Sequence, residues 1–116
     1  EMRNSKCAIS PFGWGEICTR DFEIFLYGAI LIKPDMSCFD TWPNWYLSES
    51  NGVYGPTYLP FKWDLSNLKY KISSALDKYQ NQRKIALEGQ RIYKDYTMGD
   101  KAKELFVKRF LDLIKN

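Results

Sequence analysis

The chain has 116 residues, of which 45% are hydrophobic and 16% aromatic. This composition is typical of a globular protein with a modest core, so we expect a single domain over residues 1–116. The chain contains no histidine, which excludes a Ser-His-Asp triad and a histidine zinc site, and we expect no bound metal. Its three cysteines, Cys7, Cys18 and Cys38, are irregularly spaced, and we expect them to be reduced thiols.

Charge is unevenly distributed along the chain. Residues 1–64 carry five Lys/Arg and eight Asp/Glu, whereas residues 65–116 carry twelve Lys/Arg and six Asp/Glu. A basic half can indicate a nucleic-acid or anionic-membrane partner, or simply the solvated faces of amphipathic helices. Because acids are interspersed throughout, we favour solvated faces and expect no nucleic-acid partner. No apolar run approaches the ~20 residues of a membrane span, so we expect no transmembrane segment and a cytoplasmic location, with peripheral membrane association left open.

The first elements form a strand, loop, helix and strand. A short apolar run over residues 7–10 predicts a buried strand that ends at Pro11. Thr19 is the expected N-cap of a helix over residues 20–27, which Gly28 then ends. Residues 29–32 are continuously apolar, as in a parallel strand covered on both faces. We therefore expect a βαβ unit and an α/β fold, Rossmann-like in part, with a short, mostly parallel sheet.

The segment over residues 35–61 is irregular and rich in aromatic residues, and residues 57–59 within it predict a third short strand. Asp35, Asp40, Trp42, Trp45 and Tyr46 combine acids with aromatic faces, which is common in sugar sites and equally common in packed loops. The segment as a whole is either a functional loop or an ordered aromatic cover over the sheet edge, and both interpretations remain open. For the acidic and aromatic cluster we favour packing.

The C-terminal half is expected to be helical. Asp64 or Ser66 can cap a first helix, residues 81–94 predict a second with Gly89 at a close packing point, and residues 98–100 separate it from a third. The domain thus divides into a βαβ unit with an aromatic loop (1–64) and a set of helices (65–116).

The candidate ligand site lies where the glycine-containing loop opens the first helix. Gly13 and Gly15 flank a tryptophan in this loop and Glu16 follows. Free N–H groups and the positive end of the helix dipole favour a phosphate at such a position. Arg20 is a candidate diphosphate contact, with a salt bridge to Asp21 or Glu16 as the alternative.

Glu23, one turn into the helix, can accept hydrogen bonds from ribose hydroxyls, or it can be a solvated acid favoured by the dipole. The loop matches neither G-x-G-x-x-G nor a Walker motif. A tight turn with a packed indole is the alternative reading of the loop itself.

Taken together, the elements resemble the C-terminal, sugar-nucleotide-binding domain of GT-B-type glycosyltransferases. The matching parts are Ser10-Pro11, Gly13-Trp14-Gly15-Glu16, Phe22-Glu23, Gly28 and Ala29-Ile30-Leu31-Ile32, followed by a Trp63-Asp64-Leu65 helix start and the Gln82-Arg83-Lys84-Ile85-Ala86…Gly89 helix. The chain has six residues between the two glutamates where the family has seven. Lys33-Pro34-Asp35-Met36 stands in place of the family's glycine-rich stretch.

The resemblance implies binding of a nucleoside diphosphate sugar as donor substrate, with no other cofactor. Glu23 matches the glutamate that holds the nucleotide ribose, and the amides around Gly15, Glu16 and Ile17, together with Arg20, would hold the diphosphate. The chain is much shorter than a complete enzyme of this type, so we expect a donor-binding portion that requires a missing N-terminal acceptor domain for hexosyl transfer. The alternative is a non-catalytic interaction module that binds a partner or a second copy; catalytic residues are not identified.

Overall fold

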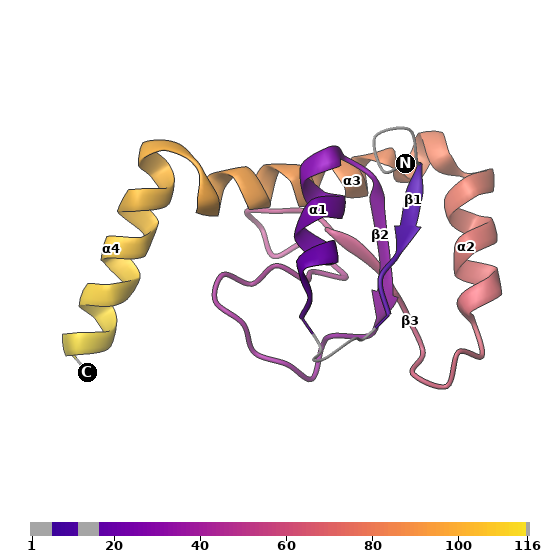
Figure 1. The fold of residues 1–116 in the computed structure, drawn as a ribbon, viewed down its shortest axis with the longest axis horizontal. Coiled ribbons are helices and arrows are strands. Elements are labelled where there is room, and N and C mark those ends of the chain that lie inside the picture. Colours follow the sequence, from indigo (N-terminus) through magenta and orange to yellow (C-terminus); the bar gives the residue numbers. More distant parts are fainter. Residues whose placement is uncertain (1–5, 12–16, 116) are drawn as a thin grey trace.

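The computed structural model describes residues 6–11 and 17–115 (Figure 1). The elements in chain order are β1 (Cys7–Ile9), α1 (Thr19–Tyr27), β2 (Ile30–Pro34), β3 (Tyr58–Phe61), α2 (Leu68–Asp77), α3 (Tyr79–Thr97) and α4 (Gly99–Lys115). The three strands form one sheet in the order β1-β2-β3, and both pairings are parallel. The expected α/β fold, with a short parallel sheet and a helical C-terminal half, is confirmed.

The carboxyl ends of the strands share one edge of the sheet, because all three strands run in the same direction. Ala8 pairs with Leu31, which in turn pairs with Tyr58. The strand arrows in Figure 1 point to the lower edge of the view, and α1 begins at this edge. The carboxyl edge of a parallel sheet, beside a helix N-terminus, is the usual ligand-binding position in α/β folds.

Strand β2 is buried on both faces, as its apolar sequence predicts. Successive side chains of a strand point to opposite faces. Accordingly, Leu31 belongs to a core cluster with α1 residues such as Phe25, whereas Ile30 and Ile32 belong to a second cluster with Ala75 of α2. Figure 1 shows the sheet between α1 on one side and α2 on the other.

Helix α3 contributes to both core clusters. Ile85 packs in the α2-side cluster, and Ile92 packs in the α1-side cluster. Gly89 lies between them, and a Cβ added there would come within 2.6 Å of the Phe25 ring. The predicted close packing at Gly89 is therefore confirmed, and its partner is α1.

Several predicted element ends differ from the structure. The N-cap of α1 is Cys18, with Thr19 as the first helical residue, and α2 begins after Asn67 instead of at Asp64 or Ser66. Asp64 accepts a hydrogen bond from the Ser66 N–H at 2.9 Å, so its carboxylate closes a turn before the helix. Gly28 ends α1 with a φ of 76°, as predicted.

The aromatic segment packs on the α1 side of the sheet. The buried Trp45 ring meets those of Phe22 and Tyr96 at centroid distances of 5.2 and 6.1 Å. The less buried Trp42 packs edge-on against Tyr96 at 5.6 Å. These contacts favour the packing interpretation of the tryptophans. None of the helices in residues 6–11 and 17–115 has the length and hydropathy of a membrane-spanning segment.

Candidate functional site

The structure describes three of the six predicted donor-site residues, and these three lie at or near the start of α1. Ile17, Arg20 and Glu23 are all exposed, and Ile17 retains 44% of its accessible surface. Arg20 and Glu23 are three positions apart on α1, a spacing that puts side chains on neighbouring parts of one helix face. The other three predicted residues, Gly13, Gly15 and Glu16, lie outside the described residues.

Directly beneath this surface lies a buried ion pair. The Lys33 Nζ lies 3.1 Å from one Asp21 carboxylate oxygen and 3.2 Å from the other, and both side chains are fully buried. Asp21 therefore pairs with Lys33, and not with Arg20. An isolated buried charge costs several kcal/mol, so each of these two charges requires the other.

The remaining hydrogen-bonding capacity of Asp21 is taken up by neutral donors. The Ser10 hydroxyl donates to Oδ1, and the Tyr46 hydroxyl donates to Oδ2 at 2.5 Å. The Cys18 backbone N–H, at the N-cap of α1, lies 3.4 Å from Oδ2. Both oxygens of the Asp21 carboxylate therefore accept hydrogen bonds, and the donors come from residues before and after Asp21 in the chain.

We call Ser10, Asp21, Lys33 and Tyr46 the buried polar cluster. Ser10 follows β1, Asp21 lies in the first turn of α1, Lys33 lies near the end of β2, and Tyr46 lies in the aromatic segment. The cluster therefore joins four parts of the chain at the carboxyl edge of the sheet. Burial, and then the hydrogen bond to Asp21, raise the pKa of the Tyr46 phenol well above its ordinary value. Its hydrogen bond to Asp21 holds the aromatic segment against α1.

The buried polar cluster was not predicted from the sequence, although one feature pointed to it. Lys33 follows a continuously apolar run in a strand expected to be covered on both faces. A lysine in such a strand needs a buried anion. Because strand parity puts Lys33 on the same face as Leu31, that anion had to come from the α1 side.

A polar hollow of about 290 Å³ opens beside the cluster. Its lining residues all follow β2 in the chain and are Met36, Ser37, Phe39, Asp40, Thr41, Asn44, Tyr46, Leu47, Ser48 and Glu49. Tyr46 belongs to both features, because it lines the hollow and its hydroxyl donates to Asp21 in the first turn of α1. Hydroxyl, amide and carboxylate groups in such a lining can bind a polyhydroxyl ligand.

In the described part of the chain, no group of three or more Cys, Asp or Glu side chains is placed to hold a metal ion. All three cysteines are free thiols, as expected. Cys18 is the one next to the buried polar cluster, with its Sγ 3.1 Å from the Ser10 hydroxyl.

The comparisons with known proteins add no relative. No family model matches the chain, and neither the curated proteins nor the solved structures include a match.

Proposed function

We propose that this chain supplies the donor-binding portion of a nucleotide-sugar-dependent glycosyltransferase and is inactive until an acceptor-binding domain completes it. One observation carries the proposal. Helix α1 begins at the carboxyl edge of a parallel sheet, and the buried Asp21–Lys33 pair ties its first turn to the end of β2.

The first turn of α1 has the properties of a diphosphate site. The N–H groups and dipole at a helix N-terminus attract anions. A positively charged residue at this end is unfavourable for the dipole unless an anion is bound there, and Arg20 is such a residue. The exposed Arg20 guanidinium then binds the diphosphate, and Glu23 on the next turn accepts hydrogen bonds from the ribose hydroxyls.

The polar hollow is the proposed position of the sugar. Its Asp40 and Glu49 carboxylates and its Asn44 amide offer acceptors and donors for hydroxyl groups. During transfer, negative charge develops on the leaving diphosphate. Pre-oriented N–H groups and Arg20 would stabilise that charge without reorganisation, so catalysis consists mainly of positioning and electrostatic stabilisation.

Calorimetric titration with UDP, GDP, ADP and CMP tests the proposal. We expect one nucleotide to bind, and Arg20→Ala or Glu23→Ala to weaken it by about tenfold, the loss of one charged hydrogen bond. Arg83→Ala and Glu104→Ala are matched controls, because both residues are exposed on other helices and should leave binding unchanged. Equal affinity in the site variants and the controls, or no nucleotide binding by folded protein, would reject the assignment.

A second candidate is a non-catalytic interaction module. Among the described residues β1 has a strand on one side only, and Ile9 on it is 37% exposed. An open sheet edge can pair with another chain. A strictly monomeric protein at high concentration in light scattering would count against a second copy at this edge.

A further inference from the structure

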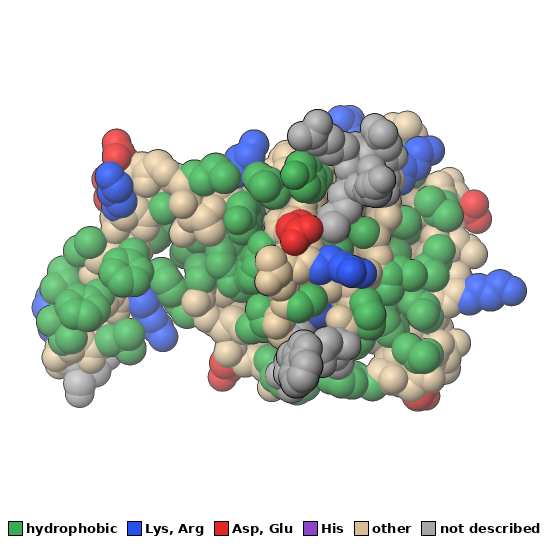
Figure 2. Space-filling view, viewed as in Figure 1, with side chains coloured by type: hydrophobic (Ala, Val, Ile, Leu, Met, Phe, Trp, Pro, Cys, Tyr) green, Lys and Arg blue, Asp and Glu red, His purple; other side chains and the backbone are tan. Residues whose placement is uncertain are grey.

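Helix α4 presents a large apolar surface that nothing in the described chain covers. None of its residues is buried. Its large apolar residues Phe106, Val107, Phe110, Leu111, Leu113 and Ile114 are each between 41% and 63% exposed. Figure 1 shows α4 extending beyond the sheet, and the same region of Figure 2 is largely covered by apolar side chains. Exposed apolar residues gathered on one helix are candidates for a contact with a protein or a membrane.

Charged side chains of α4 contact the body of the protein. Lys101 Nζ lies 3.1 Å from the Asp95 carboxylate, and the Arg109 guanidinium lies 5.9 Å from the Trp42 ring centroid. At 3.6 residues per turn, Phe110 and Ile114 lie on the side of α4 opposite Lys101. Phe106 and Leu113, three and four positions from Arg109, lie beside it. We call the six exposed residues the α4 apolar face.

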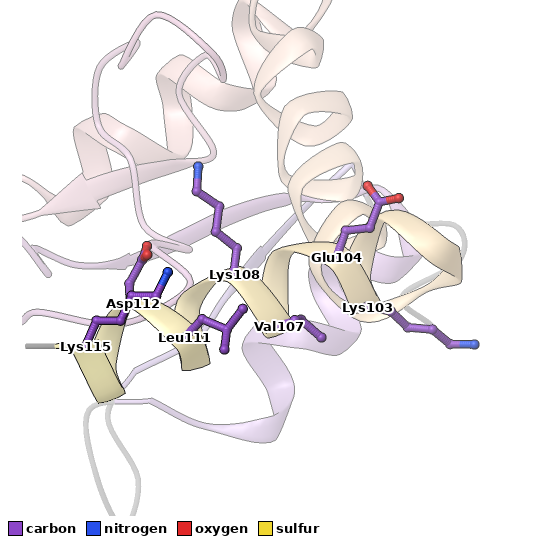
Figure 3. A pocket seen from close by; sticks show the side chains of 7 residues that line it. All are labelled: Lys103, Glu104, Val107, Lys108, Leu111, Asp112 and Lys115. Atoms are coloured by element: carbon purple, nitrogen blue, oxygen red, sulfur yellow. The ribbon is translucent and has the colours of Figure 1, made fainter.

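Lysines lie among and beside these apolar residues. One side of α4 carries the side chains of Lys103, Glu104, Val107, Lys108, Leu111, Asp112 and Lys115 (Figure 3). Two of these residues are apolar, three are lysines and two are acids. Over its whole length α4 carries five Lys/Arg and three Asp/Glu, within a C-terminal half that carries twelve and six.

Net charge favours an anionic occupant over a second copy. A second copy would bring the same net positive charge, with twelve Lys/Arg against six Asp/Glu over residues 65–116. The area of a contact between two α4 helices is also small: a 17-residue helix is about 25 Å long and 10 Å wide, which gives roughly 250 Å² per copy, against the ~800 Å² of a typical stable interface. An anionic lipid surface is complementary in charge and accepts a convex apolar helix without a preformed groove.

We propose that α4 is a membrane-surface helix that binds anionic lipid. An amphipathic helix of this kind lies in the plane of the interface. Phe106 and Phe110 enter the boundary between headgroups and acyl chains, and the lysine stems extend to the lipid phosphates. Since Arg109 packs over Trp42, in the segment that lines the polar hollow, this arrangement holds the candidate donor site near the membrane.

Vesicle co-sedimentation of the full chain tests the proposal. We expect binding to phosphatidylcholine vesicles containing about a quarter phosphatidylserine, little binding to phosphatidylcholine alone, and release as salt is raised. The double variant Phe106→Ser/Phe110→Ser should reduce binding by at least about tenfold. Its unfolding transition should stay near that of the wild type, because α4 buries no side chain.

A matched control is the variant Val53→Ser/Tyr70→Ser, since both residues are 66% exposed and lie outside α4. It should bind vesicles as the wild type does. The proposal is overturned if folded wild-type protein ignores the anionic vesicles, or if the α4 variant binds as tightly as the control. Sedimentation equilibrium provides an independent check: a dimer that the α4 variant dissociates would assign the face to a second copy and also overturn the proposal.

Discussion

Lys33 and Asp21 form an ion pair 3.1 Å long whose two side chains are completely removed from solvent. The pair connects the end of β2 to the first turn of α1, so it fixes where the N-terminus of α1 lies relative to the sheet. Any ligand bound at that N-terminus depends on this arrangement, although neither charged group is exposed to contact the ligand itself.

Removing one partner of the pair should destabilise the protein strongly. Lys33→Met leaves the Asp21 carboxylate buried without its cation, and Asp21→Asn leaves the Lys33 ammonium without its anion. Each single variant should lower the free energy of unfolding by about 3–5 kcal/mol, as measured in urea. Lys84→Met, at an exposed position of α3, is the control and should change stability by less than about 0.5 kcal/mol.

The double variant Asp21→Asn/Lys33→Met tests whether the two side chains interact with each other in the folded protein. Because it removes both charges together, its loss of stability should be smaller than the sum of the two single losses by about 1–3 kcal/mol. Strict additivity would show that the two side chains do not interact in the folded protein.

Removing the Tyr46 hydroxyl should weaken the same cluster. Tyr46→Phe deletes a donor that lies 2.5 Å from Asp21 and should lower the free energy of unfolding by about 1–3 kcal/mol. Tyr70→Phe, at a residue 66% exposed, serves as the control and should be neutral.

The same variant should change the alkaline pH dependence of stability. Burial and the hydrogen bond to Asp21 raise the pKa of Tyr46 above its ordinary value of 10.0. In the unfolded chain the phenol ionises at that ordinary value. The stabilisation that the neutral Tyr46 phenol gives the folded protein is therefore fully present below about pH 10 and declines as pH rises further. Wild type should therefore lose stability more steeply above about pH 10 than Tyr46→Phe, and equal slopes in urea titrations at several pH values would contradict the assignment.

Much of the fold was predictable because its determinants are local. The apolar run at Ile30–Ile32 and the glycine at position 28 identify a buried strand after a helix, and the structure has both. Helix periodicity likewise located the C-terminal helices, with Gly89 at a packing contact. These features depend on neighbours within a few residues, so a single sequence contains the necessary information.

Only the residue types of the candidate site could be predicted from the sequence. Arg20 and Glu23 were chosen for their residue types, and the structure puts both on the exposed surface of α1. The cluster beneath them joins residues 10, 21, 33 and 46, which are distant in sequence and meet only after β1, α1 and β2 have packed. The N-cap prediction was wrong for a local reason. The Asp21 carboxylate already accepts from the backbone N–H of Cys18, so the turn begins one residue before Thr19.

The close contact between α3 and α1 predicts that Gly89→Ala is destabilising. The added Cβ would lie 2.6 Å from Phe25 Cδ1 and 3.3 Å from the Thr57 carbonyl oxygen. Overpacking costs about 1–3 kcal/mol, more than the ~1 kcal/mol that alanine contributes through helix propensity. Thermal unfolding should show a lower midpoint, and adding Phe25→Leu should recover part of the loss. Ser73→Ala, at an exposed helical position, should not lower the midpoint.

Glu88 should contribute to the acid sensitivity of the fold. Its carboxylate accepts hydrogen bonds from the Gly55 N–H at 2.7 Å and from the Arg91 guanidinium at 2.8 and 2.9 Å. The bond from Arg91, and then that from Gly55, hold the pKa of Glu88 below its ordinary value of 4.5, against the opposing effect of burial. The unfolded chain therefore takes up this proton at a higher pH than the folded chain does. The stabilisation is present above about pH 4.5 and is lost as pH falls through the lower pKa of the folded state.

Glu88→Gln tests this prediction, because glutamine retains an acceptor for Gly55 but does not titrate. Between about pH 5 and pH 3 the melting temperature of the wild type should fall more steeply than that of Glu88→Gln. Glu104→Gln, at an exposed glutamate of α4, should keep the wild-type slope. If Glu88→Gln and the wild type lose stability in parallel over this range, the Arg91 and Gly55 contacts do not favour the ionised carboxylate in solution.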